Sequence, residues 1–168
     1  MNKQADLDKL VIEIFRAFSN LELSLCMFLS KLLLVDQFRA RVVWHSLPNF
    51  HARIRLISSL VDTYLEGTEQ ANLQKLLNKT QKVSRLRNRL AHQHYFLVED
   101  GRRVEFIGDT MDAELGMKFV GTKTYDYSNL SNTLEEFKKL TAEFGSRGNF
   151  TTDYPVALKS KFHRHSEI

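Results

Sequence analysis

Apolar residues recur every three to four positions over a long first stretch of the chain, from about Asp6 to Leu34. This spacing predicts a helix, because it places the apolar side chains on one face. The apolar positions are Leu7, Leu10, Val11, Ile14, Phe18, Leu21, Leu25, Phe28 and Leu32. Beyond Phe18 the helix is apolar nearly all round, so it must be covered on more than one side. Either it is the central helix of a monomer, or a second subunit supplies part of its cover.

Two further helices are predicted before residue 93. The first follows a cap at Ser46 or Asn49 and stops at Gly67. The second begins after a cap at Thr68 and buries a leucine-rich stripe. Between the long first helix and these two, residues 36–45 form an arginine-flanked run whose structure the pattern leaves open.

The hydrophobic period changes after His94 from that of a helix to that of a strand. Two alternating runs, Tyr95–Val98 and Val104–Ile107, flank Asp100-Gly101, a dipeptide typical of hairpin turns. The pattern near Lys118–Val120 favours a third, weaker strand. The sequence therefore predicts a small β insertion in an otherwise helical chain.

A last helix is predicted from about Ser128 to Phe144. The predicted fold class is mainly α: a helical bundle of four main helices, with a small β-hairpin insertion at about residues 95–125, before the last helix. Residues 1–148 are expected to form one helical domain, because about 100–150 residues suffice for a domain with its own core. Residues 149–168 are expected to be an irregular C-terminal tail.

The composition is typical of a soluble globular protein. Of the 168 residues, 43% are hydrophobic and 26% are charged, which argues against both a disordered chain and a membrane bundle. Cys26 is the only cysteine, so neither an internal disulfide nor a cysteine-based zinc site can form. The most apolar stretch, Leu21–Val35, contains Glu22 and Lys31 and is shorter than a membrane span. With no signal-peptide pattern at the start, we expect a cytoplasmic protein without membrane contact.

Basic and acidic residues are unevenly distributed along the chain. The formal net charge is only +4, yet residues 70–98 contain six basic side chains and no acidic one: Lys75, Lys79, Lys82, Arg85, Arg87 and Arg89. This segregation predicts a local positive patch that attracts phosphates. Solvated helix faces with no binding role would give the same pattern.

Side chains suited to phosphate chemistry gather near the end of the third predicted helix. Ser84, Asn88 and His92 are four residues apart and share a face, and the long side chain of Arg87 can swing toward it. Imidazole transfers protons near neutral pH, and guanidinium binds a phosphate and stabilises charge that develops on it. These groups suffice for metal-free RNA cleavage by the neighbouring 2′-hydroxyl. In a purely structural role, the same residues would satisfy the helix end and its dipole.

Arg87-Asn88 followed by His92 resembles the Arg-x(4–6)-His motif of HEPN domains (higher eukaryotes and prokaryotes nucleotide-binding). In the favoured form of that motif, Asn comes directly after the Arg, as it does here. The order of elements is similar over roughly residues 5–145, with a long apolar first helix, a motif-bearing third helix and one further helix. The β insertion departs from a minimal HEPN bundle. The resemblance implies an all-α bundle that dimerises and brings two motifs into one cleft. It implies a metal-independent endoribonuclease of toxin–antitoxin, phage-defence or RNA-processing type.

The resemblance also implies a role for each motif residue. Arg87 would contact the scissile phosphate, His92 would act as acid or base or position the 2′-hydroxyl, and Asn88 would support both. A polar residue of the first helix often faces this site in the family, and Glu22 is the candidate here. The remaining candidates lie on the motif helix, Ser84 as a supporting residue and three others as RNA-binding residues: Lys82, Arg85 and Arg89.

The expected partners are RNA, a second copy of the chain, and an antitoxin or another protein; no cofactor is expected. Many HEPN members are catalytically silent, so a nucleotide-binding or protein-interaction module is the alternative function, and a helical adaptor with no nucleic-acid role is a third. No metal is expected, because His92 and His94 do not share a helix face and no cysteine or acidic cluster accompanies them. His163 and His165 likewise lack further ligands. Ser84 lacks the strand–turn–helix elbow and the orienting acid of a nucleophile.

Overall fold

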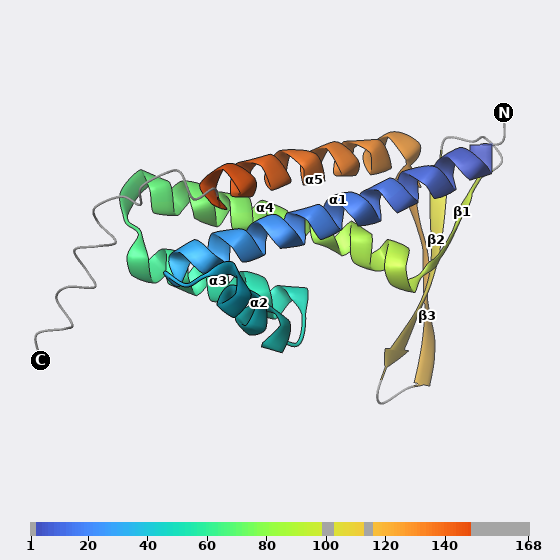
Figure 1. The fold of residues 1–168 in the computed structure, drawn as a ribbon. Coiled ribbons are helices and arrows are strands. Elements are labelled where there is room, and N and C mark those ends of the chain that lie inside the picture. The colour runs from blue at the N-terminus through green and yellow to red at the C-terminus, as the bar shows by residue number, and fades with distance from the viewer. Residues whose placement is uncertain (1–2, 99–102, 113–115, 149–168) are drawn as a thin grey trace, which may run out of the picture. The chain divides into compact units, whose positions relative to one another are not determined.

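A computed structural model of the chain describes residues 3–98, 103–112 and 116–148, with the backbone alone for residues 3, 94, 107–112 and 116–123. These residues form five helices and one three-stranded antiparallel sheet (Figure 1). In chain order the elements are α1 (Lys3–Leu32), α2 (Gln37–Ser46), α3 (Phe50–Tyr64), α4 (Gly67–His92), β1 (His94–Leu97), β2 (Arg103–Asp112), β3 (Gly116–Asp126) and α5 (Tyr127–Gly148). The prediction of a mainly helical fold with a small β insertion is confirmed.

The structure contains five helices where the sequence pattern predicted four, and the additional helix is α2. Only Ala40 and Trp44 of its ten residues are buried, so its apolar stripe is too short to show a helical period. Asp36 caps this helix, because its carboxylate accepts a hydrogen bond from the backbone N–H of Arg39 at 2.9 Å. The same hydrogen bond holds the pKa of the Asp36 carboxyl below its ordinary value.

Of the two cap candidates before α3, Asn49 is the one that caps the helix. Its side-chain oxygen accepts a hydrogen bond from the backbone N–H of Ala52 at 2.9 Å. Ser46 is instead the last residue of α2. The next helix, α4, begins at Gly67, one residue before the predicted cap at Thr68. Gly67 has a φ of 68°, in the left-handed region that favours glycine.

The β insertion has three strands in the order β1-β2-β3, and both pairs are antiparallel. Residues His94–Leu97 pair with Val104–Ile107, which confirms the two predicted alternating runs. The weaker strand expected near Lys118–Val120 lies inside β3. The predicted turn at Asp100-Gly101 and the expected tail at residues 149–168 lie outside the described residues.

The chain divides into two compact units, and α1, α4 and α5 each contribute to both. The first unit contains residues 1–19 and 82–138, that is, the start of α1, the end of α4, the sheet and the first half of α5. In its core, Phe18 of α1 meets Phe137 of α5 edge-to-face, with ring centroids 5.7 Å apart. Phe106 of β2 makes a similar contact with Tyr125 of β3 at 5.4 Å.

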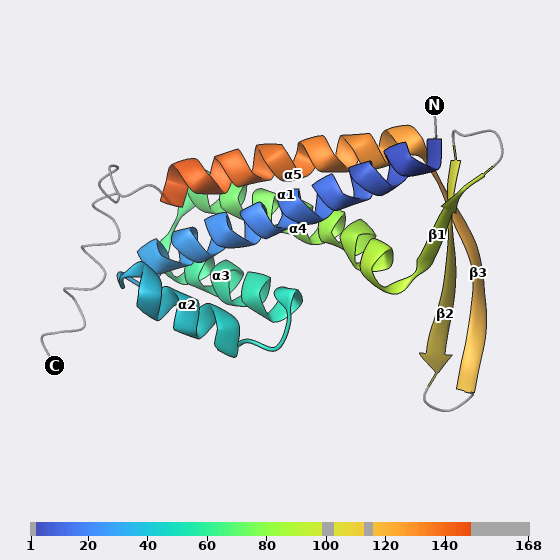
Figure 2. The ribbon, with the colours of Figure 1, turned by 45° about the vertical axis from the view of Figure 1, so that its right-hand side comes forward.

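The second unit contains residues 20–81 and 139–168. Here α2 and α3 lie beside the second half of α1 (Figure 2). Leu21, Leu25 and Leu29 have no exposed surface, so the chain itself covers most of this apolar half of α1. Of the large apolar residues in this half of α1, only Leu23 is strongly exposed, at 46%.

We expect the change Asn49→Ala to lower the free energy of unfolding by about 1 kcal/mol, because the first turn of α3 loses its capping acceptor. The measurement is urea-induced unfolding followed by circular dichroism. Asn49→Asp keeps an acceptor at the same position and serves as the control, with little loss expected. Equal losses in the two variants would show that the cap does not stabilise α3.

Candidate functional site

The predicted motif lies in the last two turns of α4, within the first unit. Leu86 and Leu90 are buried and attach this end of the helix to the core of the unit. The helix continues through His92, and the backbone N–H of Gln93 still donates to the carbonyl of Arg89 at 2.8 Å. The strand β1 begins two residues after the helix ends, which fixes the direction of the chain after His92.

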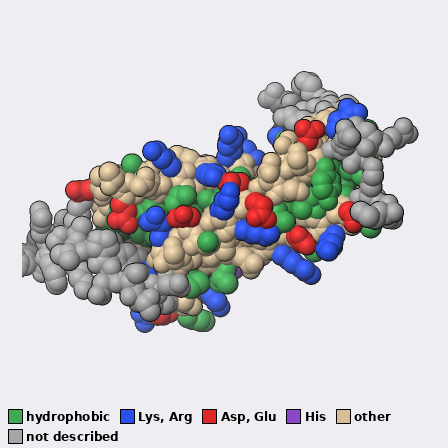
Figure 3. Space-filling view, turned by 90° about the horizontal axis from the view of Figure 1, so that it is seen from above, with side chains coloured by type: hydrophobic (Ala, Val, Ile, Leu, Met, Phe, Trp, Pro, Cys, Tyr) green, Lys and Arg blue, Asp and Glu red, His purple; other side chains and the backbone are tan. Residues whose placement is uncertain are grey.

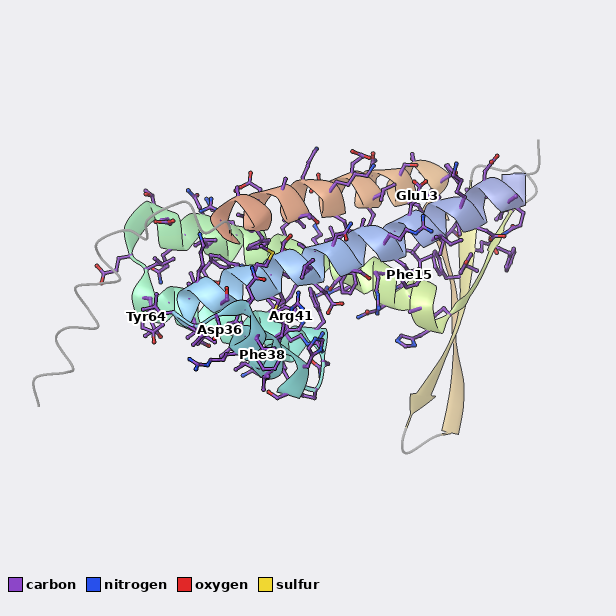
Figure 4. The ribbon with its side chains drawn as sticks, in the orientation of Figure 1. Glu13, Phe15, Asp36, Phe38, Arg41 and Tyr64 are labelled. Carbon is purple, nitrogen blue, oxygen red and sulfur yellow. The ribbon has the colours of Figure 1, made fainter. Side chains whose placement is uncertain are left out.

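Arg87 is held against two aromatic rings of α1. Its guanidinium carbon lies 4.6 Å from the ring centroid of Phe18 and 5.4 Å from that of Phe15. Figure 4 labels Phe15 on α1. A guanidinium is attracted to the faces of aromatic rings, and this attraction strengthens as water is excluded. The two rings therefore restrict the position of the Arg87 side chain before any ligand binds.

Arg87 also reaches its neighbour in the motif. One terminal nitrogen, Nη1, donates a hydrogen bond to the side-chain oxygen of Asn88 at 3.2 Å. Of the three side chains predicted to converge, Arg87 and Asn88 are joined by this hydrogen bond. Asn88 is exposed, so this hydrogen bond lies at the surface of α4.

The Nε atom of Arg87 is buried and has no hydrogen-bond partner among the described residues. Buried donors are nearly always paired in native structures, so an orphaned one needs an explanation. Nor does any described carboxylate form an ion pair with Arg87, whereas Arg53 pairs with one carboxylate and Arg147 with two. The positive charge of Arg87 is thus left without a counter-charge within the described part of the chain.

The three residues predicted to share a face differ in exposure. Asn88 and His92 are exposed, and they are one helical turn apart. Ser84 is 6% exposed and lies on the buried side of α4, so it is not at the surface with them. The structure therefore presents an amide and an imidazole together, with the guanidinium of Arg87 joined to the amide.

Glu22, the candidate from the first helix, lies in the second unit and is paired with Arg53. The Arg53 Nη1 donates to the Glu22 carboxylate at 2.6 Å, and both side chains are mostly buried. The Nε of Arg53 donates to the carbonyl of Trp44 at 3.1 Å, and the guanidinium lies over the Trp44 ring at 5.1 Å. Arg53 thus ties α1, α2 and α3 together, and Glu22 supplies its counter-charge.

The predicted RNA-binding residues also lie on α4 within the first unit. Lys82 and Arg85 are exposed, and the Arg89 guanidinium lies 5.5 Å from the ring centroid of Tyr125 in β3. None of the three forms an ion pair with a carboxylate of the described residues. Their charges are therefore available to an anionic ligand. By contrast, the face in Figure 3 mixes acidic and basic side chains and presents no large region of one sign.

Sequence reasoning missed the aromatic partners of the basic residues. Phe18 was recognised only as a core position, and Phe15 and Tyr125 were not singled out. The available signal was weak: Phe15 and Phe18 are three residues apart and so lie on neighbouring parts of one helix face. Nothing in the sequence connects them with a residue about 70 positions later.

Two other kinds of site can be assessed for the described residues. Within ranges 3–98, 103–112 and 116–148, no group of three or more His, Cys, Asp or Glu side chains is placed to hold a metal ion. No single helix there is long and apolar enough to cross a membrane, although α1 and α2, which meet at a bend of 114°, reach that length and apolarity together.

No family model, curated protein or solved structure matches the chain. The residues of the site are therefore the basis on which a function can be proposed.

We expect the change Glu22→Gln to lower the free energy of unfolding by about 2 kcal/mol, because it leaves a mostly buried guanidinium at Arg53 without its counter-charge. Denaturant titration measures the loss. The matched control is Glu69→Gln, which breaks a looser pair with Arg147 at 3.6 Å whose carboxylate is 47% exposed. That change should cost no more than about 0.5 kcal/mol. A loss at Glu22 as small as that at Glu69 would show that the Glu22–Arg53 pair does not hold α1 and α3 together.

Proposed function

We propose that the chain is a HEPN-like RNA-binding protein and a metal-independent endoribonuclease of toxin, defence or RNA-processing type, with Arg87, Asn88 and His92 as its catalytic residues. The observation that carries this proposal is the state of Arg87. Its guanidinium lies against two aromatic rings, its Nε is an orphaned donor, and no described carboxylate neutralises it. A phosphate bound at the terminal nitrogens of Arg87 would supply the missing negative charge.

The reaction we propose is an internal transfer at phosphorus. The 2′-oxygen of one nucleotide attacks the adjacent phosphorus, and the bond from phosphorus to the 5′-oxygen of the next nucleotide breaks. His92 accepts the proton of the 2′-hydroxyl, and the departing 5′-oxygen takes up a proton. The products are a 2′,3′-cyclic phosphate and a 5′-hydroxyl. Arg87 stabilises the charge that builds up on the non-bridging oxygens, and Asn88 holds Arg87 in place.

A second copy of the chain would complete this site. One imidazole cannot accept the proton of the 2′-hydroxyl and donate a proton to the leaving oxygen at the same moment. A dimer of the kind that the HEPN resemblance implies would bring a second His92 to the same phosphate. The two imidazoles would then divide the roles of base and acid.

A catalytically silent nucleotide-binding or protein-interaction module is the second candidate function, and one observation favours it. His92 is exposed, and no described side chain makes a hydrogen bond to its ring. A general base is usually oriented by a further group, as in catalytic triads. In the silent module, Arg87 and its basic neighbours would bind phosphate without turnover.

We expect wild-type protein to cleave RNA in the presence of EDTA and to leave 2′,3′-cyclic phosphate ends. His92→Ala and Arg87→Ala should each abolish cleavage, while circular dichroism shows an unchanged fold for His92→Ala. The matched control is His45→Ala, which removes an exposed histidine from α2 and should retain full activity. Equal cleavage by wild type and His92→Ala would refute the assignment, and binding without cleavage by any variant would favour the silent module.

We expect the double change Arg85→Glu and Arg89→Glu to weaken RNA binding and to lower the salt dependence of the binding constant. The slope of its logarithm against log salt should fall by roughly one for each lost phosphate contact. Fluorescence anisotropy with a short labelled RNA over a series of salt concentrations measures both effects. Lys9→Glu, an exposed charge reversal on α1, is the control. An unchanged affinity and slope in the double variant would exclude these arginines from the interface.

A further inference from the structure

Large apolar side chains are exposed where α1 passes into α2. Leu34 is 54% exposed, Phe38 76% and Val42 59%. Arg41 and Val42 come three and four residues after Phe38 on α2, so both share a face of the helix with Phe38. Figure 4 labels Phe38 and Arg41 on this helix. We call Leu34, Phe38, Arg41 and Val42 together the α2 outer face.

Leu34 adds a cost that an ordinary exposed leucine does not carry. Its φ is 53°, in the left-handed region, and it is the only residue other than glycine with a positive φ in the described part of the chain. It ends α1 in a position where glycine is favoured. A leucine here strains the backbone and exposes apolar surface at once. Covering the side chain with another apolar group would offset this cost.

The size of the face argues against a free partner. A stable interface between two separate chains buries about 800 Å² on each side. Three apolar side chains and one arginine supply only part of that area. A segment already tethered nearby needs far less contact, because a short flexible linker gives an effective concentration in the millimolar range.

The chain provides such a segment. Gly148, the last residue of α5, lies against Met27 of α1, so close that a β-carbon on it would come within 3.2 Å of the Met27 Cβ. The last residue of α5 therefore lies beside α1, five residues before that helix ends at Leu32. Five residues of helix span about 7.5 Å. An extended chain covers at most about 3.3–3.6 Å per residue, so the stretch from residue 149 to residue 158 is long enough to reach the α2 outer face.

The sequence that follows suits this face. We propose that residues 150–158, Phe-Thr-Thr-Asp-Tyr-Pro-Val-Ala-Leu, dock on the α2 outer face of the same chain. Their aromatic and aliphatic side chains cover Leu34, Phe38 and Val42. Asp153 is the only acidic residue between positions 149 and 166, and it meets the exposed guanidinium of Arg41. This surface is separate from the motif on α4 and does not depend on the proposed ribonuclease activity.

Paramagnetic relaxation in the full chain tests this docking. A nitroxide is attached to a cysteine introduced by Ser160→Cys. Cys26 stays unlabelled, because it is buried and burial raises the pKa of its thiol. The label should broaden the methyl signals of Leu34 and Val42. Phe38→Asp, which changes a side chain 76% exposed, should remove most of this broadening, and Ile12→Asp, at an exposed apolar site elsewhere on α1, should preserve it.

A second variant keeps the test valid if Phe38→Asp disturbs α2. Tyr154→Asp alters only the proposed docking segment and should also remove the broadening. The proposal would be overturned if the labelled Ser160→Cys protein showed no broadening. It would also be overturned if the broadening survived both Phe38→Asp and Tyr154→Asp. If the broadening arose only from labels on other molecules in a mixture of labelled and unlabelled protein, a second copy of the chain would be the occupant of this face, and the proposal would be wrong.

Discussion

The structure depends on the burial of one helix. α1 runs through both compact units, and its leucines at positions 21, 25 and 29 have no exposed surface. Burying apolar surface is the main favourable contribution to folding, at about 25 cal/mol for each Å² removed from water. The two clusters around arginine also depend on this helix. α1 supplies the rings of Phe15 and Phe18 to Arg87, and it supplies the carboxylate of Glu22 to Arg53.

These two arginines show how the same side chain can serve structure or function. Arg53 has a carboxylate at 2.6 Å, a carbonyl acceptor and an aromatic ring, so both its charge and its donors are satisfied. Arg87 has aromatic rings and one amide, but it has neither a carboxylate partner among the described residues nor an acceptor for its Nε. A paired arginine stabilises the fold, whereas an arginine held in place and left without a counter-charge is prepared for an anion. This difference is why the proposed site is centred on Arg87 and why Glu22 is better explained as a structural residue.

Local pattern predicted much of the fold, and tertiary contacts account for what it did not predict. The long apolar stripes of α1, α3, α4 and α5 have the helical period, and Tyr95–Val98 has the strand period, so these elements were visible in the sequence. α2 was not, because a helix with two buried residues leaves no periodic pattern. The convergence of Arg87 and Asn88 followed from their adjacency on one helix. The partners of Arg87 on α1 and the pairing of Glu22 with a residue 31 positions away join distant parts of the sequence, which a single sequence does not reveal.

The central claim is that Arg87 binds a phosphate of RNA, and the Nε–H group of Arg87 reports on it directly. The protein is titrated with an RNA in which hydrogen replaces the 2′-hydroxyl at the cleaved position, so that the RNA binds without reacting. The nitrogen–proton NMR signal of the Arg87 Nε–H group is recorded at each step of the titration. The account predicts that this signal shifts as the guanidinium gains an anionic partner, and that its exchange with water slows. An unchanged Arg87 signal at RNA concentrations that saturate binding would contradict the account.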